Sequence, residues 1–375
     1  MPSGVVVGAG VFGASLALEL ADRGWTVTLV DQYPPGHVRA ASGGESRLIR
    51  FGHGADAWYT RSAWRARALW RRREEEAERQ LFVPCGVAWL ASREDGWEAA
   101  SERMLVAEGI PVERLTPGEA AELFPSFEGE GLAFVLYEPE AGVLRARDAT
   151  RILVELALAR GVRFVGGRAE PRGRAVAVDG RELAGDQVVW ACGPWLPQLF
   201  PRLAPIRVTK QDVYFFGAPV AWETPPVPAW VDYDSAFYGL GDLDGRGVKI
   251  SPDREGPELD PDRDARVASA GGEQAARRYI AQRFPALAEA PLVGTRACPY
   301  ALTADTNFVV APHPDEEGVW LLGGGSGHGF KHGPALAEYV ADLLEGKAEP
   351  QPRFALGDRP AARSLRTAGG AALVR

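Results

Sequence analysis

The stretch from Gly4 to Asp31 constrains this chain more than any other part of its sequence. A short apolar, β-branched run leads into a glycine-rich turn, an apolar helical pattern and a second strand that ends in Asp31. The turn holds Gly8, Gly10 and Gly13 in G-x-G-x-x-G spacing. These glycines permit a tight turn, let backbone N–H groups approach a pyrophosphate and let the helix pack on the strand. The stretch therefore predicts a dinucleotide-binding βαβ unit, and it does not distinguish NAD from FAD.

The acid that ends the second strand narrows the choice of dinucleotide. A carboxylate at Asp31 can accept hydrogen bonds from ribose hydroxyl groups, and it would repel the 2′-phosphate of NADP. Because the fingerprint opens the sequence, we expect neither a signal peptide nor a separate catalytic domain ahead of it.

The composition argues against several classes of protein. The 375 residues suffice for about two to three domains, and 46% hydrophobic with 25% charged residues are ordinary for a soluble globular protein. A net charge of −8 gives no reason to expect binding to nucleic acid or to an anionic membrane. No apolar run approaches the ~20 residues of a membrane span. Three widely spaced cysteines, Cys85, Cys192 and Cys298, do not imply a disulfide framework, so we expect a reducing, cytoplasmic location.

Two arginines lie three residues apart in the apolar segment that follows the small-residue loop after the first unit. Arg47 and Arg50 could together hold a carboxylate through bidentate hydrogen bonds. The alternative is one structural ion pair and one solvated arginine. The residues alone leave both interpretations open.

A basic, tryptophan-containing helix is predicted over 58–79. It could be interpreted as a nucleic-acid surface with interleaved aromatic residues. An acidic run follows the arginines at once, however, and the whole chain is acidic. We therefore favour a surface helix whose tryptophans face the core and whose arginines pair with Glu74, Glu75, Glu76 and Glu78.

A second glycine-rich segment, from Gly323 to Pro334, opens onto a predicted helix over 335–344. Such a helix end can stabilise negative charge that develops on a reduced cofactor ring. The residue two positions after Ser326 is His328, so the segment lacks the G-x-S-x-G of a hydrolase elbow. The buried strand that runs into 191–195 also suggests close backbone approach to a flat or phosphorylated group.

The rest of the chain alternates helical and strand patterns. Further helices are predicted over 96–108, 117–123, 147–160 and 272–284, and strands over 81–90, 132–137, 162–165, 176–178, 187–190, 308–310 and 319–322. An antiparallel sheet is predicted from 207–216, 229–233, 236–240 and 247–251. The acidic run at 260–264 mimics a calcium loop but lacks its glycine and final glutamate, so we expect no metal site there. Beyond Pro350 we expect a loosely held tail.

Four motifs give the chain a resemblance to a known family: GAGVFG at Gly8–Gly13, GGESRLIR at Gly43–Arg50, RACPY at Arg296–Tyr300 and GGSGHGFK at Gly324–Lys331. With them, the chain from residue 5 to about residue 346 resembles the monomeric sarcosine oxidase family of flavoprotein amine oxidases, which includes N-methyltryptophan oxidase and pipecolate oxidase. The last two motifs are the more specific, because the first occurs in many flavin and nicotinamide proteins.

The resemblance implies roles for single residues. Cys298 matches the cysteine that bonds covalently to the flavin 8α-methyl group, although a buried structural thiol is the default for an isolated cysteine. Arg50 and Lys331 match the pair that grips the substrate carboxylate. Arg47 and Lys249 match basic residues that flank the flavin ring, and Lys249 matches the one that activates oxygen.

The substrate pocket implied by the resemblance has one departure from the family pattern. Tyr238 and Tyr300 match aromatic residues beside the pocket. Asp253, however, stands four residues after Lys249, where the family has a pocket histidine. An acid there could pair with an extra cationic or hydrogen-bonding group on a larger amino acid, so the best substrate need not be sarcosine.

The residues expected to contact FAD come from both glycine-rich segments and from the motifs between them. They are Gly8, Gly10, Val11, Phe12, Gly13, Asp31, Gly43, Ser46, Arg47, Cys192, Gly193, Trp195, Cys298, Gly325, Gly327, His328, Gly329, Phe330 and Lys331.

The resemblance also implies an α/β fold and an activity. The expected fold is a doubly wound, Rossmann-like FAD domain (1–84, 141–208 and 293–375) interleaved with a mainly antiparallel-sheet substrate domain (85–140 and 209–292). The active site should lie between the two. The implied enzyme is a monomer that oxidises a secondary amino acid: hydride passes from the carbon next to the neutral amine to flavin N5, the imine hydrolyses, and O₂ reoxidises the flavin to give H₂O₂.

Three alternatives remain open at this point. One is a primary D-amino acid or glycine oxidase on the same fold. Another is a flavin dehydrogenase that passes electrons to a different acceptor, against which Lys249 and the RACPY motif argue. The third is a flavin-binding redox sensor without turnover, which the paired carboxylate-binding residues argue against.

Overall fold

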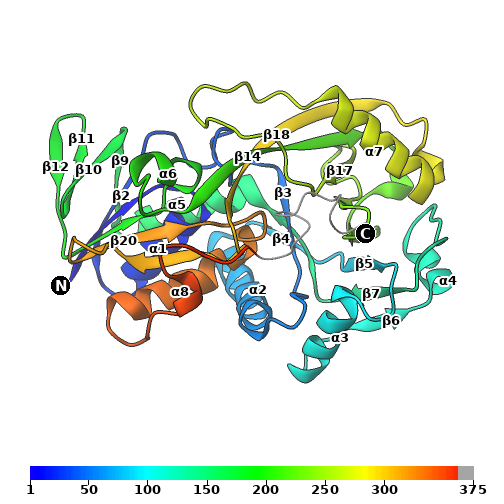
Figure 1. Cartoon of the computed structure of the whole chain (residues 1–375), viewed down its shortest axis with the longest axis horizontal. Coiled ribbons are helices and arrows are strands. Elements are labelled where there is room, and N and C mark those ends of the chain that lie inside the picture. Colours follow the sequence, from blue (N-terminus) through cyan, green and yellow to red (C-terminus); the bar gives the residue numbers. More distant parts are fainter. Residues whose placement is uncertain (362–375) are drawn as a thin grey trace.

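The structure is a computed structural model that describes residues 1–361 and contains two large sheets (Figure 1). The first is six-stranded, in the order β19-β20-β13-β1-β2-β9. Its neighbours pair in parallel except for the edge strand β19, which is antiparallel to β20. The strands are β1 (Ser3–Val7), β2 (Thr26–Asp31), β9 (Arg163–Gly166), β13 (Gln187–Trp190), β19 (Val309–Pro312) and β20 (Val319–Gly323).

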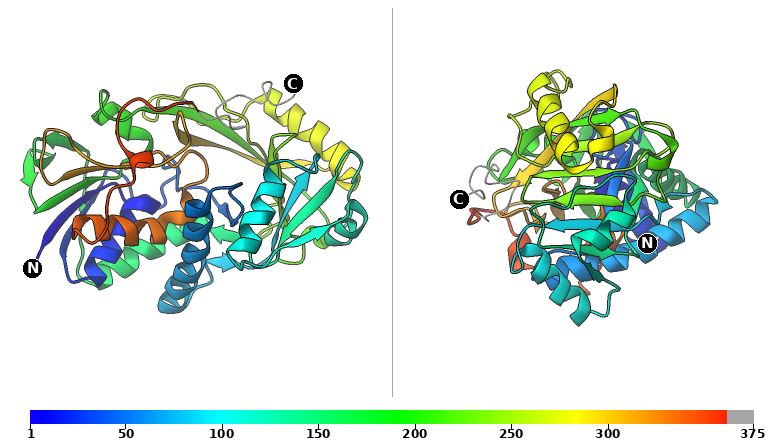
Figure 2. Two further views of the ribbon diagram at one scale, coloured as in Figure 1. Left: turned by 60° about the horizontal axis from the view of Figure 1, so that its bottom comes forward. Right: turned by 90° about the vertical axis from the view of Figure 1, so that its right-hand side faces the viewer.

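Both faces of this sheet are covered, which explains why its strands read as continuous apolar runs. Helices α1 (Val11–Asp22), α5 (Ala146–Ala159) and α8 (Gly333–Leu344) lie side by side on one face (Figure 2). The other face packs against a three-stranded antiparallel sheet, with Val5 and Val7 in one core cluster with residues of that small sheet. Its strands are β10 (Ala169–Arg172), β11 (Ala175–Val178) and β12 (Arg181–Leu183).

The second large sheet has eight strands in the order β18-β14-β17-β16-β15-β5-β7-β6. The predicted antiparallel sheet is confirmed as its centre, and the one parallel pair is β15 with β5. The strands are β5 (Val87–Ala91), β6 (Glu113–Leu115), β7 (Phe134–Glu138), β14 (Ile206–Phe216), β15 (Ala229–Asp232), β16 (Phe237–Leu240), β17 (Val248–Pro252) and β18 (Leu292–Thr303).

Short and long helices complete the two layers. Helix α7 packs its buried Tyr279 and Ile280 in one core cluster with residues of the eight-stranded sheet. The remaining helices are α2 (Ala57–Ala77), α3 (Trp97–Ala107), α4 (Pro117–Ala120), α6 (Leu196–Leu199) and α7 (Ala270–Arg283), of which α6 packs Leu196 in the core cluster of the six-stranded sheet. The 3₁₀ turns are η1 (Ala121–Leu123), η2 (Gly193–Trp195), η3 (Val220–Trp222), η4 (Pro285–Leu287), η5 (Phe330–His332) and η6 (Pro352–Phe354).

A small sheet, β3-β8-β4, joins the two layers and carries the arginine motif. Its strands are β3 (Ser46–Ile49), β4 (Phe82–Val83) and β8 (Gly142–Arg145). The prediction of one strand over 81–90 is wrong, because the chain leaves this sheet after Val83 and enters the eight-stranded sheet at Val87. Pro84 lacks an N–H for a ladder, and Gly86 takes a left-handed φ of 75°, so the strand breaks between them.

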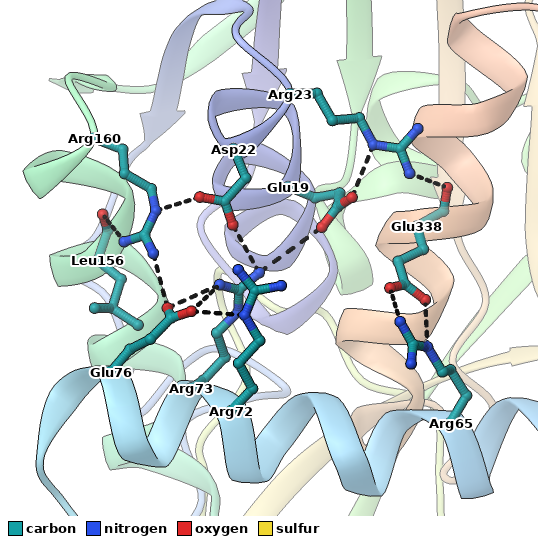
Figure 3. A network of polar contacts seen from close by, with 10 residues as sticks. All are labelled: Glu19, Asp22, Arg23, Arg65, Arg72, Arg73, Glu76, Leu156, Arg160 and Glu338. Atoms are coloured by element: carbon teal, nitrogen blue, oxygen red, sulfur yellow. Dashed lines mark hydrogen bonds and ion pairs between the residues drawn. The ribbon is translucent and has the colours of Figure 1, made fainter.

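Helix α2 is a surface helix tied to the helical layer, as the sequence predicts (Figure 3). Trp70 is fully buried, which confirms that it faces the core. The predicted pairing of arginines with Glu76 is confirmed, and further partners come from other helices. Arg72 and Arg73 pair with Glu76, but Arg73 also pairs with Asp22 of α1, and Arg65 pairs with Glu338 of α8. The neighbouring helices supply acids that the local sequence does not show.

The predicted loose tail after Pro350 is wrong for residues 351–359. Phe354 is fully buried, and Arg353 forms an ion pair with Asp56 at the start of α2. Arg359 forms a second ion pair, at 3.2 Å, with Asp305. Burial of one aromatic side chain and two ion pairs hold this segment against the start of α2 and the loop between β18 and β19. The end of the predicted tail, residues 362–375, lies outside the described residues.

Candidate active site

The first glycine-rich turn has the geometry that its sequence predicts. Gly8 has a left-handed φ of 107°, and a Cβ on Gly13 would overlap the carbonyl oxygen of Gly8. Helix α1 begins directly after Gly10, and the N–H of Val11 donates to Ser42 Oγ at 2.9 Å. The turn is therefore a backbone cradle at a helix N-terminus, where an anion is favoured.

A long cavity starts at this cradle. Asp31, at the end of β2, lies on its wall and accepts hydrogen bonds from the N–H groups of Ala9 (2.6 Å) and Tyr33 (2.8 Å). Burial raises the pKa of Asp31, while the backbone hydrogen bonds partly oppose the shift. Predicted cofactor residues on the wall are Gly8, Gly10, Val11, Phe12, Asp31, Arg47, Cys192, Gly193, Trp195, Gly325, Gly327, Gly329 and Phe330.

The other predicted cofactor residues lie elsewhere. Gly13 and Gly43 serve close backbone packing, since a Cβ on Gly43 would overlap the carbonyl oxygen of His37. The remaining ones are not on the wall of the long cavity: His328 and Lys331 line a neighbouring cavity, Ser46 lines a third, and Cys298 lies beside the wall.

A second cavity adjoins the long one and shares Arg47, Tyr300, Gly327 and Phe330 with it. It brings together the predicted substrate residues, which are far apart in the sequence. Its wall consists of Arg47, Leu48, Arg50, Val231, Tyr238, Asp253, Tyr300, Gly327, His328, Phe330 and Lys331. We call it the substrate cavity.

Two buried cations stand on the wall of the substrate cavity. Arg50 is 4% exposed; its guanidinium donates to the carbonyl oxygen of Gly52 (3.0 Å) and to the Tyr233 hydroxyl (3.3 Å). Lys331 is 2% exposed, and its Nζ donates to the carbonyl oxygen of His328 at 3.0 Å. A buried cation attracts an anionic ligand more strongly than a solvated cation does, because little water screens its charge.

Lys249 lies near the substrate cavity. Its Nζ is 3.3 Å from both the carbonyl oxygen and Oγ of Ser46, and 5.2 Å from the ring centroid of Tyr238. Lys249 lines a third cavity with Ser46, while its neighbour Tyr238 lines the substrate cavity. Burial lowers the pKa of Lys249; Arg47 adds to the shift, and Tyr238 opposes it.

Cys298 is buried on β18, with its Sγ 3.9 Å from Nη2 of Arg47. It packs with Val213 and Phe215. Tyr300, two residues along the strand and so on the same face as Cys298, lines both cavities. Cys298 therefore lies next to the guanidinium of Arg47, and Arg47 is part of the wall of the long cavity.

Two histidines next to the substrate cavity, His53 and the fully buried His332, escaped the sequence analysis, whereas His328 was predicted as a cofactor residue and lies on the cavity wall. The ring of His53 lies 5.3 Å from that of His332 and 5.7 Å from that of His328. Burial lowers the pKa of His53 and of His332 well below the ordinary value, and Lys331 and Arg50 lower both further. The sequence feature that could have indicated His332 as a site residue is its position directly after Lys331.

Comparison with known proteins identifies the family. Residues 5–343 match the family described as FAD dependent oxidoreductase. The chain belongs to that family. It is 27% identical over 374 residues to a monomeric sarcosine oxidase from Bacillus sp. (strain B-0618), covering 95% of this chain and 96% of the relative. It is 24% identical to an N-methyl-L-tryptophan oxidase from Yersinia pestis (strain Pestoides F), covering 92% and 95%.

Among solved structures, the L-proline dehydrogenase from P. horikoshii has the same fold as this FAD-dependent oxidoreductase. The TM-score is 0.82 at 22% identity, and the superposition covers 94% of this chain and 95% of the other. Within residues 1–361, no helix is both long and apolar enough to cross a membrane, and no group of three or more His, Cys, Asp and Glu residues could hold a metal ion.

The residues of the long cavity fit the FAD that the family binds. The backbone cradle at Gly8 and Gly13 leaves no room for side chains. Asp31 lies on the same wall, at the end of the second strand. The cavity extends from this cradle to the second glycine-rich segment at Gly323 and to Tyr300, which also lines the substrate cavity. A dinucleotide held along this wall would therefore reach the substrate cavity at one end.

Proposed function

We propose that this protein is an oxidase of a secondary amino acid, either N-methylated or cyclic. The observation that carries the proposal is the pair of buried cations, Arg50 and Lys331, on the wall of a cavity that shares Tyr300 and Phe330 with the FAD cavity. Two buried positive charges that face one small cavity suit a carboxylate, which can accept charge-assisted hydrogen bonds from both.

The residues of the substrate cavity would orient and prepare the substrate. Arg50 and Lys331 hold the carboxylate, while Tyr238 and Tyr300 confine the rest of the molecule. The same two cations disfavour a protonated amine nearby, so they favour the neutral amine, whose lone pair is needed for hydride to leave the adjacent carbon. When bound, FAD supplies the acceptor for that hydride, which comes from the carbon next to nitrogen. Hydrolysis of the resulting imine completes the oxidation.

Lys249 is proposed to serve the reaction with oxygen. It is a buried cation beside Ser46 and near the ring of Tyr238, and it is not part of the wall of the substrate cavity. A fixed positive charge stabilises the negative charge that O₂ acquires when it is reduced to H₂O₂. The location of Lys249 away from the carboxylate-binding pair supports a role in oxygen reduction rather than in substrate binding.

Three further features complete the proposal. Cys298 is the proposed attachment point of FAD, supported by its place in RACPY and by the guanidinium of Arg47 beside its sulfur. The division into an FAD domain (1–84, 141–208 and 293–375) and a substrate domain (85–140 and 209–292) also stays a proposal, as does the monomeric state.

Asp253 is the proposed determinant of the substrate side chain. It is 1% exposed and lies on the wall of the substrate cavity with both buried cations. A carboxylate at this position favours a substrate that carries an additional cation or hydrogen-bond donor.

A substrate panel tests the function. Sarcosine, N-methylalanine, pipecolate, L-proline, N-methyltryptophan and Nα-methyllysine are compared with D-alanine and glycine, with peroxide release in air and anaerobic bleaching of FAD as the two measurements. We expect bleaching and peroxide from secondary amino acids only. Asp253→Asn should reduce the preference for Nα-methyllysine over N-methylalanine.

Each alternative gives a different pattern in this panel. Bleaching without peroxide would identify a dehydrogenase. Preference for D-alanine or glycine would identify a primary amino acid oxidase. Absence of bleaching by every amino acid would contradict the proposal as a whole.

A further inference from the structure

Glu138 is a fully buried carboxylate that lies outside both cavity walls but next to Arg50. It ends strand β7 of the eight-stranded sheet, where it is paired with Val87. Arg50 directly follows β3, in the small sheet that joins the two layers. The acid and the arginine therefore come from different layers of the protein.

The carboxylate of Glu138 accepts three hydrogen bonds. Its Oε2 accepts from the N–H of Phe51 at 2.6 Å, and its Oε1 accepts from the N–H of Gly52 at 2.9 Å. Oε1 also accepts from the indole N–H of Trp89 at 2.6 Å. Three donors on one buried carboxylate form a charge-assisted network, which holds its members more firmly than neutral hydrogen bonds do.

Two of these donors belong to residues that hold the guanidinium of Arg50. The carbonyl oxygen of Gly52 accepts from Arg50 Nη1 at 3.0 Å, and the face of Trp89 lies 4.7 Å from the guanidinium carbon. The guanidinium of Arg50 makes a third contact, with the hydroxyl of Tyr233. The ring centroid of Tyr233 lies 5.4 Å from that of Trp89. All three contacts thus involve residues that Glu138 holds directly or through Trp89.

The backbone of this turn approaches the carboxylate of Glu138 closely at Gly52. A Cβ on Gly52 would lie 2.9 Å from Oε1 of Glu138 and 3.3 Å from Oγ of Ser101. The turn after β3 therefore has glycine where the backbone must approach the buried carboxylate closely. The residue type at Gly52 and the acid at Glu138 depend on each other.

We propose that Glu138 is a positioning residue for the binding of carboxylate ligands. It fixes the turn at Gly52 and the ring of Trp89, and these two in turn aim the guanidinium of Arg50 into the substrate cavity. The inference rests on the proposed function, because it takes Arg50 as a carboxylate-binding residue. It adds a residue of the other layer to that site.

Neutralising Glu138 changes anion binding in opposite directions depending on whether Glu138 positions Arg50 or acts only through its own negative charge. If Glu138 acted on the ligand only through its charge, its neutralisation would remove a repulsion and tighten the binding of an anion. If it positions Arg50, neutralisation weakens the binding. Glu138→Gln keeps the shape but turns an amide NH₂ toward N–H donors, so at least one of the three hydrogen bonds is lost.

The experiment uses the FAD-loaded enzyme and two non-oxidisable probes. Methoxyacetate resembles sarcosine with an ether oxygen in place of the amine, and methoxyacetamide is its neutral counterpart. Dissociation constants come from changes in the flavin absorption spectrum. For Glu138→Gln we expect at least tenfold weaker binding of methoxyacetate and less than twofold change for methoxyacetamide.

Two further variants keep the test decisive. Glu98→Gln is a matched control: Glu98 is another buried glutamate, on α3, whose pKa burial raises to about 7. It should change neither dissociation constant. Trp89→Phe removes the indole N–H but keeps a ring under Arg50, so it should weaken methoxyacetate binding about threefold to tenfold. Trp89→Phe also tests the proposal if the Glu138→Gln variant does not fold.

The contradicting outcomes are distinct. Unchanged or tighter binding of methoxyacetate by Glu138→Gln, or an equal loss for both probes, would overturn the positioning role. A wild-type enzyme that does not bind methoxyacetate better than methoxyacetamide would instead overturn the carboxylate site itself, and with it the proposed function.

Discussion

Nη2 of Arg47 lies 3.9 Å from Sγ of Cys298, although 251 positions separate the two residues in the chain. Arg47 is itself held in place, since its guanidinium donates to the carbonyl oxygens of Ser46 and Ala41 at 2.7 Å each. A fixed guanidinium beside a sulfur stabilises negative charge on that sulfur. The thiolate is the form that can attack the flavin 8α-methyl carbon.

This relationship predicts a covalent flavin. Acid-precipitated wild-type protein should stay yellow, and its mass should exceed that of the bare chain by one FAD less two hydrogen atoms, because forming the C–S bond reduces the flavin and O₂ then reoxidises it. Cys298→Ala should release the colour into the supernatant. Cys85→Ala, which removes another buried thiol, should keep it. Release of flavin from the wild-type protein by acid would show that the bond does not form.

Arg50 and Lys331 should contribute to the binding of carboxylates and little to the binding of amines. Arg50→Gln or Lys331→Met should weaken amino-acid binding by roughly 2–5 kcal/mol, the typical loss when one member of a buried charge interaction is removed. N-methylated amines without the carboxylate should be affected far less. Lys347→Met, at an exposed lysine, is the control. Equal losses for both kinds of ligand would refute the role.

Lys249 should govern the reaction of the reduced enzyme with oxygen. Lys249→Met removes the charge and keeps similar bulk, so reoxidation in stopped-flow mixing should slow by about two orders of magnitude, or about 2.7 kcal/mol. Anaerobic reduction by substrate should fall much less. If reduction collapses while reoxidation keeps its wild-type rate, Lys249 belongs to the substrate site.

The lowered pKa of Lys249 adds a pH dependence to this prediction. Because burial lowers that pKa from its ordinary value of 10.5, the ammonium loses its proton at a lower pH than a solvated lysine. Reoxidation should therefore slow as the pH rises toward 10. This alkaline decline should be absent from Lys249→Met.

His332 should make the folded protein sensitive to acid. Its imidazole is fully buried and its pKa lies well below 6.5, so the unfolded chain takes up a proton before the folded one does. The free energy of unfolding is thus unaffected above pH 6.5 and decreases below it, by at most about 1.4 kcal/mol per pH unit for this group. In denaturant titrations between pH 7 and 5, His332→Phe should show a smaller decrease than wild type.

Local sequence determined the dinucleotide-binding unit. The positions of Gly8, Gly10 and Gly13 follow from backbone sterics within a single turn, so the pattern predicted a geometry that the structure confirms. The long helices and the central antiparallel strands were predicted for the same reason, since periodicity is a local property. The motif around Cys298 supported the family resemblance. The sequence analysis did not predict that Cys298 lies within a 12-residue strand, β18.

The surroundings of the site residues were decided by tertiary structure. Glu138 meets the turn at Gly52 from 86 positions away, and the Nζ of Lys249 lies 5.2 Å from the ring of Tyr238, which lines the substrate cavity. Residues that meet only after two sheets have joined leave no periodic or motif signal in the chain. The sequence specified which cations are present; the packing of the two layers decided which of them are buried, what holds them and which cavity they face.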